Sequence, residues 1–102
     1  MAKRSVPLSF AARVRPPEGV MVRELGGESV LLNLNTESYF GLDEVGTRMW
    51  VVLTAADSIQ AAHETLLAEY QVEPEQLSRD LEALVDQLVE HGLAEVLVGE
   101  VG

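Results

Sequence analysis

Short runs of alternating apolar and polar residues dominate the first half of the chain, and each run ends in a turn sequence. Residues 19–25 run into Gly26-Gly27, which is typical of a tight hairpin turn. Residues 29–34 form the next run, and a polar turn separates them from residues 39–42. Within the second run, alternation places three apolar residues on one face of a strand: Val30, Leu32 and Leu34. The pattern predicts a three-stranded antiparallel meander.

Helical periodicity replaces this alternation in the second half, where apolar residues recur three or four positions apart. Asp43 stands where an N-cap is expected and begins the first helix. Asp57, followed three residues later by Gln60, resembles a capping box, so it predicts the start of a second helix that reaches Tyr70. We expect Trp50, in the first helix, to lie in the core.

A third helix is expected to begin at Pro74, because the first helical turn does not need the N–H that proline lacks, and to end at His91-Gly92. Residues 93–98 follow it as a short extended wing. The residues before Glu18 show no sustained period and too few apolar positions for a strand or a helix. The expected organisation therefore has three parts: an N-terminal basic arm of uncertain order (1–17), a folded domain (18–98) and a C-terminal tail (99–102).

These elements predict an α+β fold in which a three-stranded antiparallel meander packs on three helices. The two last helices and the wing follow one another as in a winged helix-turn-helix domain. A small sheet that does not close leaves backbone N–H and C=O groups unpaired along an edge. Such an edge must be blunted, covered or used to capture an extended peptide, and we expect capture.

Composition narrows the class of protein. A chain of 102 residues supports one domain with one modest core, and 47% hydrophobic residues argue against wholesale disorder. The sequence has no cysteine, which excludes disulfides, thiolate zinc sites and cysteine nucleophiles. It also has no apolar run of the length of a membrane span or a signal peptide. We expect a cytoplasmic protein with no cofactor and no metal site.

Charge is divided unevenly along the chain. Residues 1–23 carry five basic residues against Glu18, whereas the remainder carries two basic residues against sixteen acidic ones. Residues 73–90, which include the third helix, have six acidic residues and only Arg79 as a base. Because phosphate neutralisation dominates affinity for DNA, this helix argues against a nucleic-acid partner. The alternative is a winged-helix regulator whose basic arm contacts DNA while its acidic body mediates dimerisation.

Neither histidine indicates a catalytic site. His63 lies near the centre of the apolar face of the second helix, where we expect a hydrogen-bonded core or boundary histidine. His91 lies in the last turn of the third helix, where its cationic form would interact favourably with the helix dipole, so we expect a capping role. No serine or threonine has a recognisable base-bearing motif around it. We expect no catalytic residue; a cofactor-free enzyme subunit is the alternative that turnover by the purified protein would reveal.

The polar residues of the third helix fall into two groups when successive residues are placed 100° apart. One group, mostly acidic, lies opposite the leucine stripe. The other runs along one shoulder of that stripe and consists of Gln76, Asp80, Ala83 and Gln87. Small or hydrogen-bonding side chains beside leucines suit the wall of a shallow groove, and they suit an ordinary core boundary equally well. Both interpretations stay open.

The order of the elements and several segments resemble the PqqD-like family, the recognition domains that bind leader peptides of ribosomally synthesised and post-translationally modified peptides (RiPPs). The resemblance spans about residues 20–96, so residues 18–98 correspond to a PqqD-like peptide-recognition domain. The segments that carry it are VLLNLNTESYFGLD (30–43), GTRMW (46–50), YQVEP (70–74), DLEAL (80–84) and LVEHGL (88–93).

The resemblance implies that a leader peptide adds an antiparallel strand to the third strand and lies against the third helix. It assigns side-chain pockets to the helix shoulder described above and to Leu84. It assigns backbone pairing to five residues of the third strand: Ser38, Tyr39, Phe40, Gly41 and Leu42. Because Tyr39 and Phe40 project to opposite faces of a regular strand, at most one of them lines the groove and the other serves the core.

A free-standing domain of this length, with Tyr-Phe-Gly-Leu-Asp at the end of the third strand, is most similar to the leader-binding proteins of lasso-peptide biosynthesis. Those proteins deliver the precursor to a separate leader peptidase and a cyclase. The resemblance therefore implies a non-enzymatic protein whose partners are a precursor leader peptide, a leader peptidase and also a cyclase, without nucleic acid or membrane. A homo-oligomer and a PqqD-type chaperone role in another peptide-modification pathway stay open.

Overall fold

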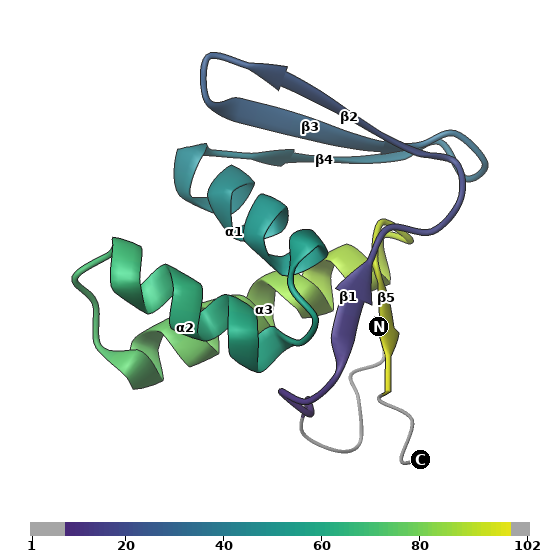
Figure 1. Ribbon diagram of the computed structural model, residues 1–102. Helices are drawn as coiled ribbons and strands as arrows, with labels where there is room; N and C mark the ends of the chain where they lie inside the picture. Colours follow the sequence, from purple (N-terminus) through teal and green to yellow (C-terminus); the bar gives the residue numbers. More distant parts are fainter. Residues whose placement is uncertain (1–7, 99–102) are drawn as a thin grey trace.

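A computed structural model describes residues 8–98 of the chain, and the predictions for residues 1–7 and 99–102 lie outside this part. The strands are β1 (Arg13–Arg15), β2 (Val20–Leu25), β3 (Glu28–Asn33), β4 (Ser38–Leu42) and β5 (Glu95–Leu97); the helices are α1 (Glu44–Ala55), α2 (Ile59–Glu69) and α3 (Pro74–Glu90). The meander β2-β3-β4 lies as one layer over the helices, and β1 and β5 form a second, two-stranded sheet beside them (Figure 1). The predicted α+β fold, with a three-stranded antiparallel sheet on three helices, is confirmed.

The central strand β3 decides how the meander meets the helices. Val30, Leu32 and Leu34 share one face, as the alternation predicted, but it is the outer face: Val30 is 44% exposed and Leu34 54% exposed. The face that packs on the helices is formed by the intervening residues Ser29, Leu31 and Asn33, all of which are buried.

The two polar residues on this inner face are hydrogen-bonded, which makes their burial tolerable. The Ser29 hydroxyl lies 2.7 Å from the Thr47 hydroxyl of α1. The Asn33 side-chain amide donates to the Gly92 carbonyl at 2.6 Å, immediately after α3. These bonds fix the sheet to the first and the last helix, so the inner face needs only Leu31 as its central apolar contact.

The helices begin and end largely where the sequence places them. Asp43 is the N-cap of α1, and its carboxylate accepts from the Gly46 N–H at 2.8 Å. Pro74 is the first residue of α3, and Gly92 follows the helix with a φ of +71°, the left-handed conformation that favours glycine. The predicted cap of α2 is wrong by one residue. Ser58, not Asp57, is the N-cap, because the Ser58 hydroxyl accepts from the N–H three residues further on, at 3.0 Å.

The described part of the predicted N-terminal arm is part of the folded domain. Residues 13–15 form β1, which pairs antiparallel with β5, so the prediction that this region lacks a strand is wrong and the predicted wing is confirmed as its partner. The Ala12 carbonyl accepts from the Ile59 N–H and the Phe10 carbonyl from the Gln60 N–H, both at 2.8 Å. These two N–H groups open α2 and have no acceptor within that helix. The segment thus caps α2, and three of its side chains are buried: Leu8, Ala12 and Val14.

Within residues 8–98, no helix combines the length and the apolar character that crossing a membrane requires. The same residues contain no group of three or more His, Asp or Glu side chains arranged to hold a metal ion.

The two histidine interpretations agree with the structure. His63 is buried, with Nε2 3.0 Å from the Pro74 carbonyl oxygen and 3.1 Å from the Ser78 hydroxyl. Trp50 is buried in the core, as predicted.

Candidate peptide-binding site

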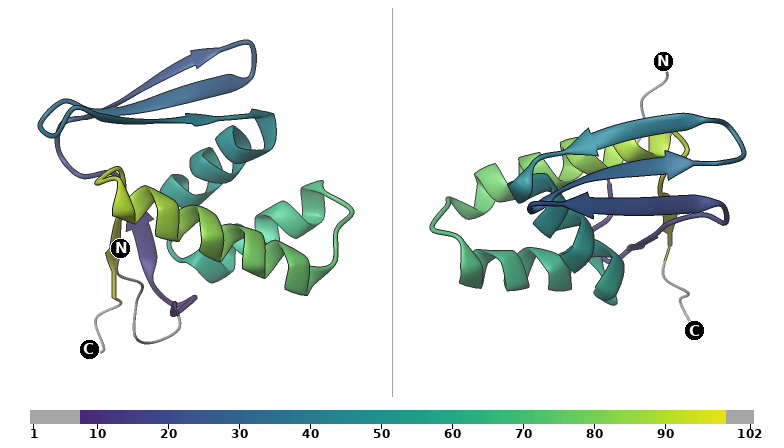
Figure 2. Two further views of the ribbon diagram at one scale, coloured as in Figure 1. Left: turned by 180° about the vertical axis from the view of Figure 1, so that it is seen from behind. Right: turned by 90° about the horizontal axis from the view of Figure 1, so that it is seen from above.

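The strand β4 forms an open edge of the meander. It pairs with β3 on one side, and no other strand between residues 8 and 98 pairs with its second side. The strand β1 pairs with β5 instead of with β4, so β1 does not cover this edge. Figure 2 shows, in its right-hand view, that α3 runs along the β4 side of the sheet rather than along the β2 side. The open edge and one flank of α3 therefore border the same side of the molecule.

The turn between β3 and β4 determines which backbone groups reach that edge. Asn33 stands opposite Ser38 in the ladder, and its carbonyl accepts from the Glu37 N–H at 2.7 Å. Asn33 therefore directs its backbone groups toward β4. Because this direction alternates along antiparallel strands, every second residue of β4 bonds to β3, starting from Ser38. Tyr39 and Gly41 consequently direct their N–H and C=O groups outward, where an added strand would meet them.

The two aromatic residues of β4 lie on opposite faces, as the alternation predicted. Tyr39 is on the outer face and is 70% exposed. Phe40 is on the inner face, partly buried against the core. Its ring contacts the His91 ring, with centroids 5.2 Å apart and planes inclined by 56°. Phe40 therefore joins β4 to the C-terminal end of α3.

The predicted shoulder of α3 is an exposed surface rather than a buried boundary. Gln76, Asp80, Ala83 and Gln87 are all exposed. The Gln76 side-chain amide donates to the Asp80 carboxylate at 2.8 Å, so these two residues hold each other along the helix. A residue four positions beyond Gln87 continues the same stripe, and this residue is His91. The shoulder thus ends at the contact with Phe40, where helix and strand meet.

Two of the ten predicted site residues are buried, unlike the other eight. Leu42 is only 6% exposed and Leu84 only 9% exposed, and both belong to the hydrophobic core. Both are buried, whereas the remaining eight residues have at least part of their surface accessible.

Sequence reasoning assigned His91 a capping role and did not assign it to the site. The capping role is confirmed, since His91 Nδ1 donates to the Gln87 carbonyl oxygen at 2.8 Å. Its ring contact with Phe40 adds a second role, at the junction of the strand and the shoulder. The spacing of four residues from Gln87 was the signal that places it in the same stripe.

Charge near the site is mostly negative, because acidic residues line the solvent side of α3. An ion pair away from the site, between α1 and α2, changes the pKa of both of its members. The hydrogen bond from the Arg48 guanidinium, at 2.9 Å, lowers the pKa of the Glu69 carboxyl, and the same contact raises the pKa of Arg48. Both side chains are partly exposed, so the pair contributes little to stability.

Comparisons with known proteins agree with this geometry. The family model described as coenzyme PQQ synthesis protein D (PqqD) matches residues 28–94. One similar solved structure is "TbiB1 in Complex with the TbiA(beta) Leader Peptide", with 33% identity and a TM-score of 0.73 over 79% of this chain and 94% of that chain. Another is "Lasso peptide synthetase B1 complexed with the leader peptide", with 28% identity and a TM-score of 0.73 over 81% of this chain and 98% of that chain. No curated protein matches the chain.

Proposed function

Because this chain belongs to the PqqD family of RiPP recognition elements, we propose that it binds the leader segment of a ribosomally synthesised precursor peptide. The observation that supports the proposal most directly is the open edge of β4 beside the exposed shoulder of α3. The similar structures named above were solved with leader peptides, which supports the same class of ligand for this chain.

The leader adds an antiparallel strand to β4 in this proposal. Tyr39 and Gly41 supply the backbone pairing, since their N–H and C=O groups are directed outward. Peptide side chains on the inner side meet the shoulder of α3, where Ala83 leaves space and Asp80 offers a hydrogen-bond acceptor. Ser38 and Phe40 border the peptide from the strand, while Leu42 and Leu84 stay buried in the core.

The contribution of the domain to a reaction is tethering rather than catalysis. A bound leader raises the local concentration of the attached core peptide for a second enzyme, by the effective-concentration effect of linked binding. We propose a leader peptidase and a cyclase of a lasso-peptide pathway as those enzymes. A PqqD-type role in a different peptide-modification pathway uses the same site and differs only in the enzyme that receives the precursor.

Direct DNA binding is less well supported. Two basic residues of the expected DNA-contacting arm, Arg13 and Arg15, lie in β1 and are held there by its pairing with β5. The Arg15 guanidinium donates to the Glu95 carboxylate at 3.3 Å. The acidic solvent side of α3 would in addition repel a phosphate backbone.

A nuclear magnetic resonance titration tests the proposal. The isotope-labelled full chain is titrated with the leader peptide of a candidate precursor, and the amide resonances are followed. We expect the Tyr39 and Gly41 amides to shift most along β4, and the purified protein alone to leave the peptide chemically unchanged. Unshifted β4 amides at saturating peptide would contradict strand addition, and modification or cleavage of the peptide would contradict a binding role.

A further inference from the structure

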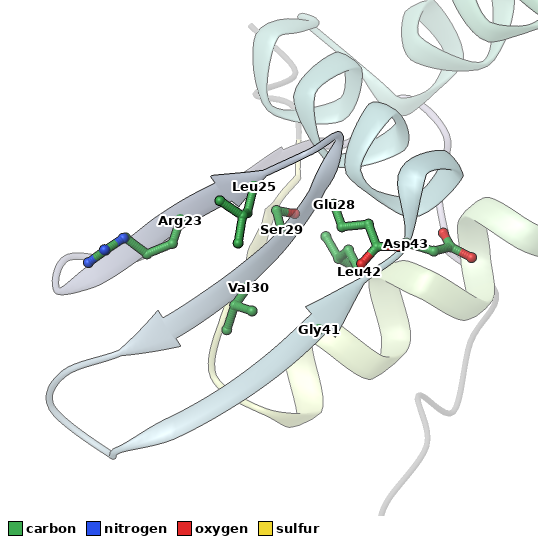
Figure 3. A pocket seen from close by; sticks show the side chains of 8 residues that line it. All are labelled: Arg23, Leu25, Glu28, Ser29, Val30, Gly41, Leu42 and Asp43. Carbon is green, nitrogen blue, oxygen red and sulfur yellow. The ribbon is translucent and has the colours of Figure 1, made fainter.

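Three residues form a row across the outer face of the meander. Gly41 of β4 stands opposite Val30 of β3, and Val30 stands opposite Arg23 of β2. Directly opposite residues of a sheet share a face, and Val30 is 44% exposed there. Figure 3 shows this row from close by, with Val30 between the two outer strands. The exposed surface of Val30 therefore lies between Gly41, which has no side chain, and Arg23.

Gly41 leaves a gap in this row. A Cβ atom at this position would meet no atom within 4 Å, so neither crowding nor backbone conformation requires a glycine here. The gap opens into a depression of about 380 Å³, which Arg23 and Leu25 border on the far side and Asp43 at one end. A glycine within a strand, without a local reason, often marks a place where a ligand or another chain approaches closely.

A strand added to β4 would place one of its residues directly opposite Gly41, with its side chain on this outer face. Adjacent strands lie about 4.8 Å apart, so the backbone of Val30 is about 10 Å from the backbone of such a guest. A short side chain ends above Gly41, whereas a long one passes over the glycine and reaches Val30. Aromatic side chains are known to compensate for a cross-strand glycine in this way.

We propose that the depression over Gly41 and Val30 binds a large apolar side chain of the captured peptide, with an aromatic ring as its best occupant. The inference rests on the proposed strand addition to β4. A ring in this position covers the exposed isopropyl group of Val30 and lies beside the Tyr39 side chain, two residues away on the same face. An acidic side chain is disfavoured, since the carboxylates of Glu28 and Asp43 outnumber the single guanidinium of Arg23 in the lining of the depression.

Peptides selected from a random display library against the full chain test the proposal. The peptides retained are those that shift the Tyr39 and Gly41 amides, and nuclear Overhauser contacts to the Gly41 α-protons identify the peptide residue that lies opposite. We expect an aromatic residue at this position. Its replacement by alanine should weaken binding roughly tenfold in the wild-type chain.

Two variants of the chain isolate the depression from the backbone pairing. Gly41→Leu keeps the edge N–H but fills the gap, and Val30→Ser removes the apolar floor from a strand that the peptide does not pair with. In both variants, the aromatic-to-alanine change in the peptide should weaken binding no more than about twofold. The difference from the roughly tenfold effect in the wild-type chain is the coupling that a double-mutant cycle measures.

The outcomes separate this inference from the proposed function. If the aromatic-to-alanine change weakens binding equally in the wild type and in both variants, the depression does not hold the side chain. The same conclusion follows if β4-binding peptides show no preference for aromatic residues opposite Gly41. Both results leave strand addition intact. If no selected peptide shifts the β4 amides, strand addition fails and this inference fails with it.

Discussion

The Phe40 ring of β4 contacts the His91 ring at the end of α3, with centroids 5.2 Å apart. The contact joins the open strand edge to the exposed shoulder of the helix, since His91 continues the stripe that contains Gln87. This aromatic pair is therefore a point at which the two expected walls of the peptide site meet.

Truncation of Phe40 should loosen this junction. Phe40→Ala removes a partly buried ring that packs on the core, so we expect the free energy of unfolding to fall by about 2 kcal/mol, less than for a fully buried phenylalanine. Leader affinity should fall as well. Tyr39→Ala is the matched control, because this side chain is 70% exposed and its loss should change stability by no more than about 0.5 kcal/mol. Urea denaturation of both variants measures the difference, and equal destabilisation would contradict the assignment of faces.

Removal of one edge N–H should abolish peptide capture without unfolding the domain. Gly41→Pro removes a donor that points away from β3, so the internal ladder keeps its bonds. We expect leader binding to be lost in calorimetric titration while the thermal transition stays cooperative. Gly41→Ala is the control, since its Cβ has free space and its N–H remains, and it should still bind. A folded Gly41→Pro variant with unchanged affinity would show that the peptide does not pair at this residue.

The helix shoulder can be tested separately from the strand. Asp80→Ala removes a carboxylate from the shoulder of α3 that the proposal places against the leader, and we expect the leader to bind roughly three- to tenfold more weakly, the loss of one hydrogen bond. Glu75→Ala removes a carboxylate from the opposite, solvent side of the same helix and should leave the affinity unchanged. Fluorescence anisotropy with a labelled leader compares the two. Equal effects would indicate a general charge effect rather than a local contact.

The N-cap of α2 also gives a paired prediction. Ser58→Ala removes the hydroxyl that accepts from the Ala61 N–H, so we expect a loss of about 1 kcal/mol in the free energy of unfolding. Asp57→Ala, one residue earlier, should have little effect, because Asp57 is exposed and does not cap the helix. Chemical denaturation monitored by circular dichroism distinguishes the two. A larger loss for Asp57→Ala would restore the capping box that the sequence suggested.

The sequence predicted those features of the candidate site that depend only on the local period of a strand or a helix. The opposite orientation of Tyr39 and Phe40 follows from the two-residue period of a strand, and the stripe from Gln76 to Gln87 follows from the helical period. The outward direction of the Gly41 N–H could not be predicted, because it depends on how the turn after Asn33 closes. The depression over Val30 could not be predicted either, since it requires the register between two strands.

The sequence by itself determined the meander, the three helices, the stop at Gly92 and the core positions of Trp50 and His63, because turns, caps and periodicities act between residues that are close in the chain. Its segments also carry the resemblance to the PqqD family, which the family model over residues 28–94 bears out. The tertiary structure alone decided that Leu31 rather than Val30 faces the helices, and that residues 13–15 form a strand. The first depends on which side of the sheet the helices cover. The second depends on β5, which lies about 80 residues further along the chain, and on two N–H groups at the start of α2 that need acceptors. Local patterns carry no information about such distant partners.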